Sequence, residues 1–529
     1  MSCRGWPCAR HRHRKVRASP GPHPVPVPFP WATLDTWYDA VVVGAGFGGL
    51  ATALELCRRG ARVALCEGLN YPGGCASTFR RGGYAFESGA TLFSGFDVHQ
   101  LFGRWIREHA LDVTVEPVDP LVELRAPGLR LPVHRDRARF IGELCALPGA
   151  PVDAIQRFFE TQARVAGVLW PLFDNPDLLP PLNLKSLLRH AGRAWTYAPL
   201  ARWLGRPLGA VVAHHGLEHF TPLRTYLDAL CQITVQCSAA EAEAPFALAA
   251  MDYYWRGTGH VRGGIGQLAK ALTGAITARG GDVLMANRVR AVTPVDGGWK
   301  VTARRGELLA RHVVANVLPQ GLRSLIDAPV GRLPRVDALA ERLEGGWGAA
   351  MLYLVVRPPE GDSGSARHLE LVRDSTQAFI EGNHLFASVS GVTDEGRARP
   401  GQRTVTVSTH VPLKKLAGLS PEAQGPYFAQ LHARMREGLE ALSPEWMGQG
   451  QVVHAMTASP RTFQRFTLRE AGAVGGVPRR AGLDNYRTLG PFQADRGLWL
   501  VGDSVFPGQS TLATAVGGVR TAASIASAR

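Results

Sequence analysis

The chain has 529 residues, 45% of them hydrophobic, and its formal net charge at pH 7 is +15. This length exceeds a single ordinary core, so we expect a globular protein with two or three packed domains. No run of about eighteen uninterrupted apolar residues occurs, which argues against a membrane-spanning helix and leaves peripheral contact as the expected form of any membrane association.

The first thirty residues contain six basic side chains and no acid, which leaves a charge of about +9 for the rest of the chain. Alternating prolines from Pro20 to Pro30 favour an extended, solvated chain, and the segment lacks the apolar centre of a signal peptide. We therefore expect residues 1–35 to be a disordered basic tail or the product of a start site assigned too far upstream. Attraction to anionic lipid is the main alternative. Nucleic-acid binding is disfavoured because no aromatic platform accompanies the basic residues.

The eight cysteines form no C-x-x-C pair and lie largely in apolar segments. This pattern predicts reduced, buried thiols in a cytoplasmic protein rather than a disulfide framework or a zinc site. No other group of side chains has the spacing of metal ligands, so we expect no metal.

A nucleotide-binding unit is predicted between Tyr38 and Glu67. The apolar run Asp39 to Val43 has the character of a buried parallel strand and leads into Gly44, Gly46 and Gly49 in G-x-G-x-x-G spacing. Such glycines permit a tight turn, close approach of the backbone to a pyrophosphate, and close packing of the following helix. A second strand, Val63 to Cys66, ends at Glu67, where an acid can bind the ribose hydroxyls of an adenine dinucleotide.

A second glycine-rich segment follows directly and includes Pro72, Gly73, Gly74, Glu87 and Gly89. Here the chain resembles the phytoene desaturase, carotenoid isomerase and amine oxidase superfamily of flavoproteins, in which this loop lies along the FAD. The resemblance implies that FAD is the cofactor and that Gly73 and Gly74 contribute to its site. Glu87 departs from the pattern, because the family usually has Asp there.

The middle of the chain is expected to be largely helical. Short strands are predicted between Val113 and Val133, and a helix begins near Pro151. The stretch Lys185 to Gly216 contains five basic residues, no acid, and interleaved Trp, Tyr and Leu side chains. That composition is typical of an interfacial helix at a membrane surface, and the resemblance favours this interpretation over a basic surface helix with its apolar face in the core.

The resemblance continues in the second half of the chain. A glycine-rich loop and a helix from Gln267 to Arg279 precede Val289, which matches a valine whose backbone faces the adenine in relatives. Strands are predicted at 351–356, 369–372, 385–392 and 404–410, and a helix at 421–442. A loop near the isoalloxazine in relatives is resembled by Arg461, Phe463, Phe466, Gly472, Gly475 and Gly476. At the end of the chain, Gly502 and Asp503 resemble the terminal FAD motif, in which the Asp contacts the ribityl-pyrophosphate region.

We therefore expect an α/β fold with a Rossmann-type FAD-binding domain built from discontinuous segments. These segments are 36–110, 256–345 and 485–529. Segments 111–255 and 346–484 are expected to form a β-sheet substrate domain with a helical, membrane-facing part.

The resemblance implies an FAD-dependent carotenoid desaturase that acts on an acyclic carotenoid, with the 3,4 bond as one candidate position. A conjugated polyene can lose a hydride to flavin N5 because the remaining cation is delocalised, and this reaction needs placement more than a strong base. Accordingly, no catalytic base is identified; Glu87 is the one acid that the motif places near the flavin, with a structural role as its alternative. A quinone or oxygen would accept the electrons. The alternatives are polyene isomerisation or saturation by reduced FAD, and a flavin-free lipid-binding protein.

Overall fold

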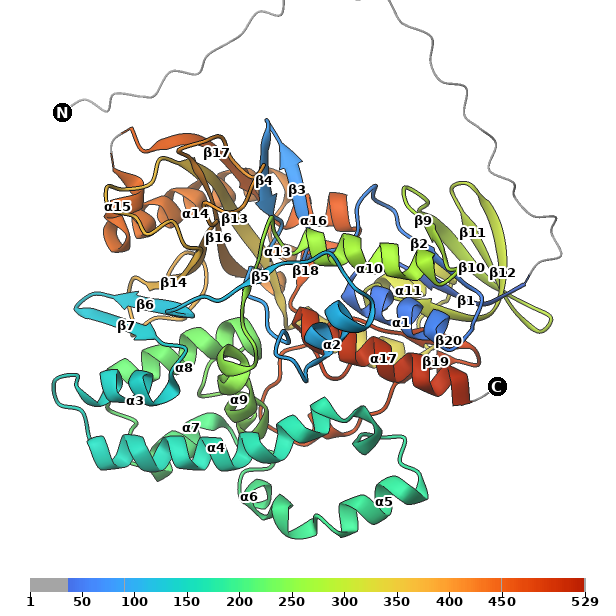
Figure 1. The fold of residues 1–529 in the computed structure, drawn as a ribbon, viewed down its shortest axis with the longest axis horizontal. Helices are drawn as coiled ribbons and strands as arrows, with labels where there is room; N and C mark the ends of the chain where they lie inside the picture. The colour runs from blue at the N-terminus through green and yellow to red at the C-terminus, as the bar shows by residue number, and fades with distance from the viewer. Residues whose placement is uncertain (1–36, 90, 449, 528–529) are drawn as a thin grey trace, which may run out of the picture. The chain divides into compact units, whose positions relative to one another are not determined.

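The computed structural model describes residues 37–527 apart from residues 90 and 449. The predicted tail, residues 1–35, lies outside the described residues. Two large sheets, each flanked by helices, organise the described chain (Figure 1).

The first sheet is built on a parallel core. The strand β1 pairs in parallel with β2 on one side and with β12 on the other, and β20 extends the sheet beyond β12. The sheet order is β10-β11-β12-β1-β2-β9, with β20 and β19 branching from β12. Its strands are β1 (Trp37–Val43), β2 (Val63–Cys66), β9 (Asp282–Leu284), β10 (Val289–Val295), β11 (Gly298–Ala303), β12 (Gly306–Ala315), β19 (Phe492–Asp495) and β20 (Leu498–Leu500).

The second sheet has the order β17-β13-β16-β15-β14-β6-β7, with β18 paired to β13. Its strands are β6 (Val122–Ala126), β7 (Leu129–Val133), β13 (Trp347–Val356), β14 (Arg367–Val372), β15 (His384–Val389), β16 (Arg403–Pro412), β17 (Val452–Ala458) and β18 (Ala473–Val474). Strand β17 was not predicted from the sequence. Two short antiparallel pairs complete the strands: the hairpin of β3 (Thr78–Arg81) with β4 (Tyr84–Glu87), and β5 (Val115–Glu116) with the distant β8 (His260–Val261).

The helices divide between the two sheets and a separate helical layer. The first sheet is flanked by α1 (Phe47–Arg58), α2 (Leu101–Glu108), α10 (Gly266–Ala278), α11 (Pro319–Leu325), α12 (Pro334–Glu344) and α17 (Thr511–Ser527). Near the second sheet lie α13 (Leu413–Ala417), α14 (Pro421–Leu442), α15 (Pro444–Met447) and α16 (Pro460–Thr467). The helical layer contains α3 (Arg137–Cys145), α4 (Val152–Asp174), α7 (Leu208–His214), α8 (Thr221–Thr234) and α9 (Ala244–Met251).

Several sequence predictions are confirmed. The strands at 39–43 and 63–66 and the helix between them are present, and Gly60 follows that helix with a left-handed φ of +77°. The helix predicted at 421–442 has the same bounds in the structure, because Ser420 caps it and Pro421 occupies its first turn. Of the six described cysteines, Cys57, Cys66, Cys231 and Cys237 are buried as predicted, whereas Cys75 and Cys145 are half-buried.

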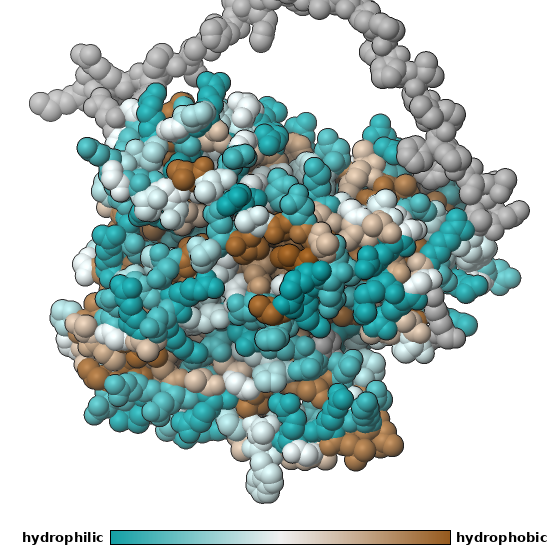
Figure 2. Space-filling view, in the orientation of Figure 1, coloured by the Kyte–Doolittle hydropathy of each residue, from teal (hydrophilic) through white to brown (hydrophobic). Residues whose placement is uncertain are grey.

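The prediction for residues 185–216 is wrong in one respect, because this stretch is not one continuous helix. It comprises α5 (Leu184–Ala191), a 3-10 turn, α6 (Ala198–Ala201) and α7. Trp203, Leu208 and Val211 are buried in the helical core. The exposed large apolar side chains of this region lie within residues 182–204, which we call the α5–α6 surface; there Leu184 is 74% and Trp195 91% exposed. Figure 2 shows apolar surface at the lower right, where Figure 1 draws α5.

The terminal helix α17 packs closely on α1, and two glycines permit that approach. A Cβ on Gly518 would lie 2.3 Å from the carbonyl oxygen of Gly48. The Thr52 hydroxyl donates to Gly48 at 2.8 Å and is 3.3 Å from the carbonyl oxygen of Gly518. The last helix of the chain is thereby fixed against the first.

We expect Gly518→Ala to lower the free energy of unfolding by about 1–3 kcal/mol, because the added methyl group overpacks the α1–α17 contact. The control is Gly274→Ala in α10, where a Cβ would meet open space. That change should raise stability by up to about 1 kcal/mol, since alanine favours a helix. Thermal unfolding of both variants checks the prediction; an undiminished midpoint for Gly518→Ala would contradict the close packing.

Candidate functional site

A cavity of about 1180 Å³ lies at the carboxyl ends of the first sheet's parallel strands and extends to the second sheet. Side chains from β13, β15 and α9 form apolar parts of its wall, including Met351, Phe386, Phe246 and Ala249, whereas β16 contributes the polar residues Ser408, Thr409 and His410. Most of the predicted site residues line this one cavity: Gly44, Gly46, Glu67, Gly73, Gly74, Val289, Gly502 and Asp503.

The loop between β1 and α1 presents its backbone to the cavity. Gly44 has a φ of +97°, and a Cβ on Gly46 would lie 2.5 Å from the Nδ2 of Asn316. Gly49 does not line the cavity but lies beneath this loop, where its Cβ would come within 2.1 Å of the carbonyl oxygen of Gly44. The loop therefore leaves the N-terminus of α1, with its partial positive charge, open to a phosphate group.

Asn316 supports this loop, and the sequence analysis missed it. It follows β12 directly, and its backbone N–H donates to the carbonyl oxygen of Val43 at 2.8 Å. Its side-chain Oδ1 lies 3.0 Å from the positions that a Cβ on Gly48 or on Gly502 would occupy. The sequence signal that could have identified Asn316 is its position directly after a strand, because Glu67 occupies the same position after β2.

Glu67 is held in place by the loop that it faces. Its carboxylate accepts hydrogen bonds from the backbone N–H of Ala45 at 2.7 Å and of Leu69 at 2.8 Å. Burial raises the pKa of Glu67, although these N–H donors oppose that shift. The carboxylate therefore lies between the glycine loop and the second glycine-rich segment, which suits an acceptor for ribose hydroxyls.

Two further predicted positions complete this end of the cavity. The backbone N–H of Gly73 donates to the carbonyl oxygen of Ala45 at 2.8 Å, and Gly73 and Gly74 both have positive φ. Val289 begins β10, is 7% exposed, and lies between Arg288 and Arg290, which also line the cavity.

Asp503 follows β20 at the cavity wall and forms an ion pair with Arg469, with an N–O distance of 2.7 Å. Arg469 was not singled out from the sequence, because the pair joins residues 34 positions apart. Of the stretch that resembles an isoalloxazine loop, Phe463 and Gly475 line the cavity. Phe466 is instead 48% exposed, because residues 460–467 form helix α16.

Glu87 does not line the cavity. Its carboxylate accepts hydrogen bonds from the Ile265 N–H and the Thr78 hydroxyl, both at 3.0 Å, and lies 3.5 Å from the Arg397 guanidinium. Burial raises the pKa of this carboxyl group. The placement favours the structural role for Glu87 over a role as base.

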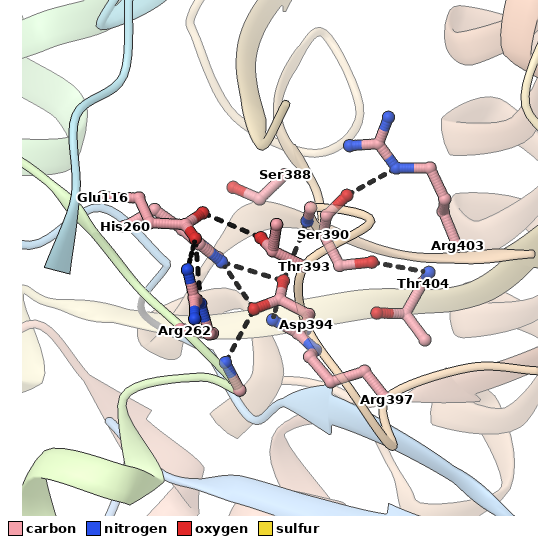
Figure 3. Close-up of polar contacts among 12 residues, drawn as sticks. Glu116, His260, Arg262, Ser388, Ser390, Thr393, Asp394, Arg397, Arg403 and Thr404 are labelled. Atoms are coloured by element: carbon pink, nitrogen blue, oxygen red, sulfur yellow. Dashed lines mark hydrogen bonds and ion pairs between the residues drawn. The ribbon is translucent and has the colours of Figure 1, made fainter. Parts of the chain in front are cut away.

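The network around Glu87 joins the two sheets. Arg397 lies 3.7 Å from Asp394, whose carboxylate oxygen also lies 2.8 Å from the Nε2 of His260 (Figure 3). The same Asp394 carboxylate accepts the Gly263 N–H at 2.6 Å. Residues after β15 are therefore fixed to the loop that begins α10.

The residues present fit an adenine dinucleotide. The cradle lacks Cβ atoms at Gly44 and Gly46, the N-terminus of α1 is open, and Glu67 is a half-buried acid. These are the groups that pyrophosphate and ribose require. Among the described residues, no group of three or more His, Cys, Asp or Glu side chains could hold a metal ion.

A comparison with protein families matches residues 47–423 to the family described as "Flavin containing amine oxidoreductase". The chain is 26% identical to the chloroplastic prolycopene isomerase of Arabidopsis thaliana, over 92% of this chain and 82% of that protein. It is 24% identical to the neurosporene-forming phytoene desaturase of Cereibacter sphaeroides, over 89% of this chain and 91% of that protein.

The fold is also similar to that of solved structures. A triple mutant of putrescine oxidase, made in a redesign of its cofactor binding, superposes with a TM-score of 0.63 at 16% identity. The match covers 93% of this chain and 99% of that one. The described chain thus has the mixed α/β fold of that oxidase.

We expect Gly46→Val to weaken retention of FAD by about tenfold to 100-fold, because the branched side chain collides with Asn316 and fills the cradle. The control is Gly142→Val, at an exposed helical position in α3 where a Cβ meets nothing within 4 Å. The flavin-to-protein absorbance ratio after purification measures the effect. Full flavin occupancy in Gly46→Val would contradict the assignment of this loop.

Proposed function

Because the chain belongs to the flavin containing amine oxidoreductase family and is an FAD-dependent oxidoreductase, we propose that it dehydrogenates C–C bonds of an acyclic carotenoid. The observation that carries this proposal is the single cavity, in which the nucleotide loops and the apolar walls of β13, β15 and α9 are continuous. Its volume of about 1180 Å³ exceeds the usual range for a site that holds one small ligand. Similarity to a phytoene desaturase over most of both chains supports the polyene as substrate class.

We propose that the cavity-lining residues divide the work between cofactor and substrate. Gly44, Gly46, Glu67, Gly73, Gly74, Val289, Gly502 and Asp503 would hold the FAD, with Gly49 packed beneath the loop. Bound FAD supplies a two-electron acceptor. The apolar side chains would orient the polyene and exclude water. The proton that the polyene loses in addition to the hydride would leave to solvent without a dedicated base.

The same division extends to the domains. We propose that segments 36–110, 256–345 and 485–529 form the FAD-binding domain, since every strand of the first sheet falls within them. Segments 111–255 and 346–484 would form the substrate domain.

A second candidate is polyene isomerisation with reduced FAD. The similarity to prolycopene isomerase favours it, because that match covers most of both proteins at slightly higher identity than the desaturase match. Saturation of a double bond by reduced FAD belongs to the same class. The three candidate reactions differ in the hydrogen content of the product: the polyene loses two hydrogens in desaturation, keeps them in isomerisation and gains two in saturation.

We further propose that the α5–α6 surface docks on an anionic bilayer and admits the polyene. None of the helices in the described part of the chain is both long and apolar enough to cross a membrane. The α5–α6 surface combines exposed Leu184, Leu188 and Trp195 with the basic Lys185 and Arg189. Exposed aromatic and leucine side chains beside basic groups are typical of an interfacial segment. A membrane quinone and oxygen are the two candidate electron acceptors.

Anaerobic mixing of the FAD-loaded protein with detergent-dispersed acyclic carotenes tests the reaction. Desaturation predicts bleaching of the oxidised flavin by one equivalent of substrate, with a product that is two hydrogens lighter. Isomerisation or saturation instead requires flavin that is already reduced, with product mass unchanged or two hydrogens heavier. Two results together would contradict the proposal that this protein acts on polyenes. The oxidised flavin would stay unbleached with every carotene, and the carotenes would stay unchanged when the flavin is reduced.

Changing Arg189, Arg193 and Arg202 of the α5–α6 surface, together with the adjacent Arg206, to Gln should release the protein from anionic vesicles, because each basic group near such a surface contributes about 1 kcal/mol. Sedimentation with phosphatidylglycerol vesicles at moderate salt measures the effect, and bleaching by dispersed substrate should be unchanged.

The matched control removes four other exposed arginines, which are Arg332, Arg399, Arg434 and Arg436. That variant should sediment as wild type does, because its changes lie away from the α5–α6 surface. Equal sedimentation of both variants would show that the α5–α6 surface does not direct the docking.

A further inference from the structure

Arg479 is a buried cation in the wall of the cavity. It follows β18 and is 7% exposed, and its backbone is fixed on both sides. Its N–H donates to the Val235 carbonyl oxygen at 2.9 Å, and its own carbonyl oxygen accepts the Glu243 N–H at 2.9 Å. The guanidinium lies over the Phe246 ring, 5.5 Å from its centroid. This side chain is therefore held in one position beside the cavity.

Among the described residues, no carboxylate lies within ion-pair distance of Arg479. Three other buried arginines pair with acids: Arg125 with Glu123, Arg397 with Glu87 and Arg403 with Asp362. Arg520, the other described buried arginine without an acid, does not line the cavity and donates to the carbonyl oxygens of Pro180 at 2.6 Å and Leu489 at 2.5 Å. Burial, with a smaller effect of Arg342, lowers the pKa of Arg479 to about 10, so the group still carries its charge at neutral pH. A buried charge without a counter-charge is costly, which indicates that an anionic group in the cavity compensates it.

The neighbours of Arg479 indicate which anion this is. Its Nη2 donates to the Pro507 carbonyl oxygen at 3.2 Å and lies 3.0 Å from where a Cβ on Gly508 would be. This segment leads directly into α17, whose N-terminus carries partial positive charge. The pyrophosphate is already provided for by the loop at the N-terminus of α1. The anion left to assign is therefore the one that appears when FAD is reduced.

We propose that Arg479 stabilises the anionic reduced form of FAD and thereby raises its midpoint potential. This inference rests on the redox function proposed above. A hydride from the substrate carries two electrons and one proton, so the flavin gains one negative charge while the second substrate proton leaves to solvent. A fixed positive charge nearby favours that charged state over the oxidised one.

The test is the midpoint potential of bound FAD, measured by dye equilibration without any polyene, so its outcome does not depend on the carotenoid substrate. In Arg479→Gln and Arg479→Met, the ratio of the affinity for reduced FAD to that for oxidised FAD should be at least about tenfold lower than in wild type. This change lowers the midpoint potential by about 30 mV or more. The matched control is Arg480→Gln, because Arg480 is adjacent, partly exposed and paired with Glu241. It should leave the potential unchanged.

Arg479→Lys keeps the experiment decisive if the neutral variants do not fold. Its potential should match that of wild type at neutral pH and should fall below it at higher pH, once the buried lysine loses its proton. A potential equal to wild type in either neutral variant, or a lysine variant that follows wild type up to about pH 10, would overturn the proposal.

Discussion

The structure depends on one close contact, in which the backbone around Gly44, Gly46 and Gly49 packs without Cβ atoms against Asn316 and against itself. That contact sets the path of the chain from β1 into α1. A second contact of the same kind lies at Gly518, where α17 approaches α1, so the first and last helices of the described chain are fixed to one another. The cofactor site is thus assembled from segments far apart in the sequence, and a single added side chain at this point should affect both stability and cofactor retention.

A second constraint joins the two sheets. Glu87, Arg397, Asp394 and His260 form a buried polar network that links the residues after β15 to the start of α10. Such groups are costly to bury singly but hold a defined geometry when each has partners. The apolar wall and the nucleotide loops consequently face the same cavity. In this account the acid that the motif placed near the flavin, Glu87, supports the cavity from outside instead of acting within it.

The sequence predicted the elements whose signals are local. The strands β1 and β2 are short apolar runs, and α14 has a serine cap and a proline in its first turn. Features that arise from pairing of distant segments were missed, namely Asn316 after β12, the Arg469–Asp503 ion pair, and the edge strand β17. Residues 185–216 were misread because their composition suits one interfacial helix, whereas Gly192, Pro199, Gly205 and Pro207 interrupt it.

The central claim is that this chain uses FAD to change the number of double bonds in a polyene. Pigment analysis of an acyclic-carotenoid-producing host that expresses the chain tests it most directly, with the flavin-deficient Gly46→Val variant expressed alongside. The account predicts carotenoids with additional double bonds, lighter by two hydrogens for each, in cells with the wild-type chain and not in cells with the variant. Unchanged pigments in a host that contains the folded, flavin-loaded protein would contradict it.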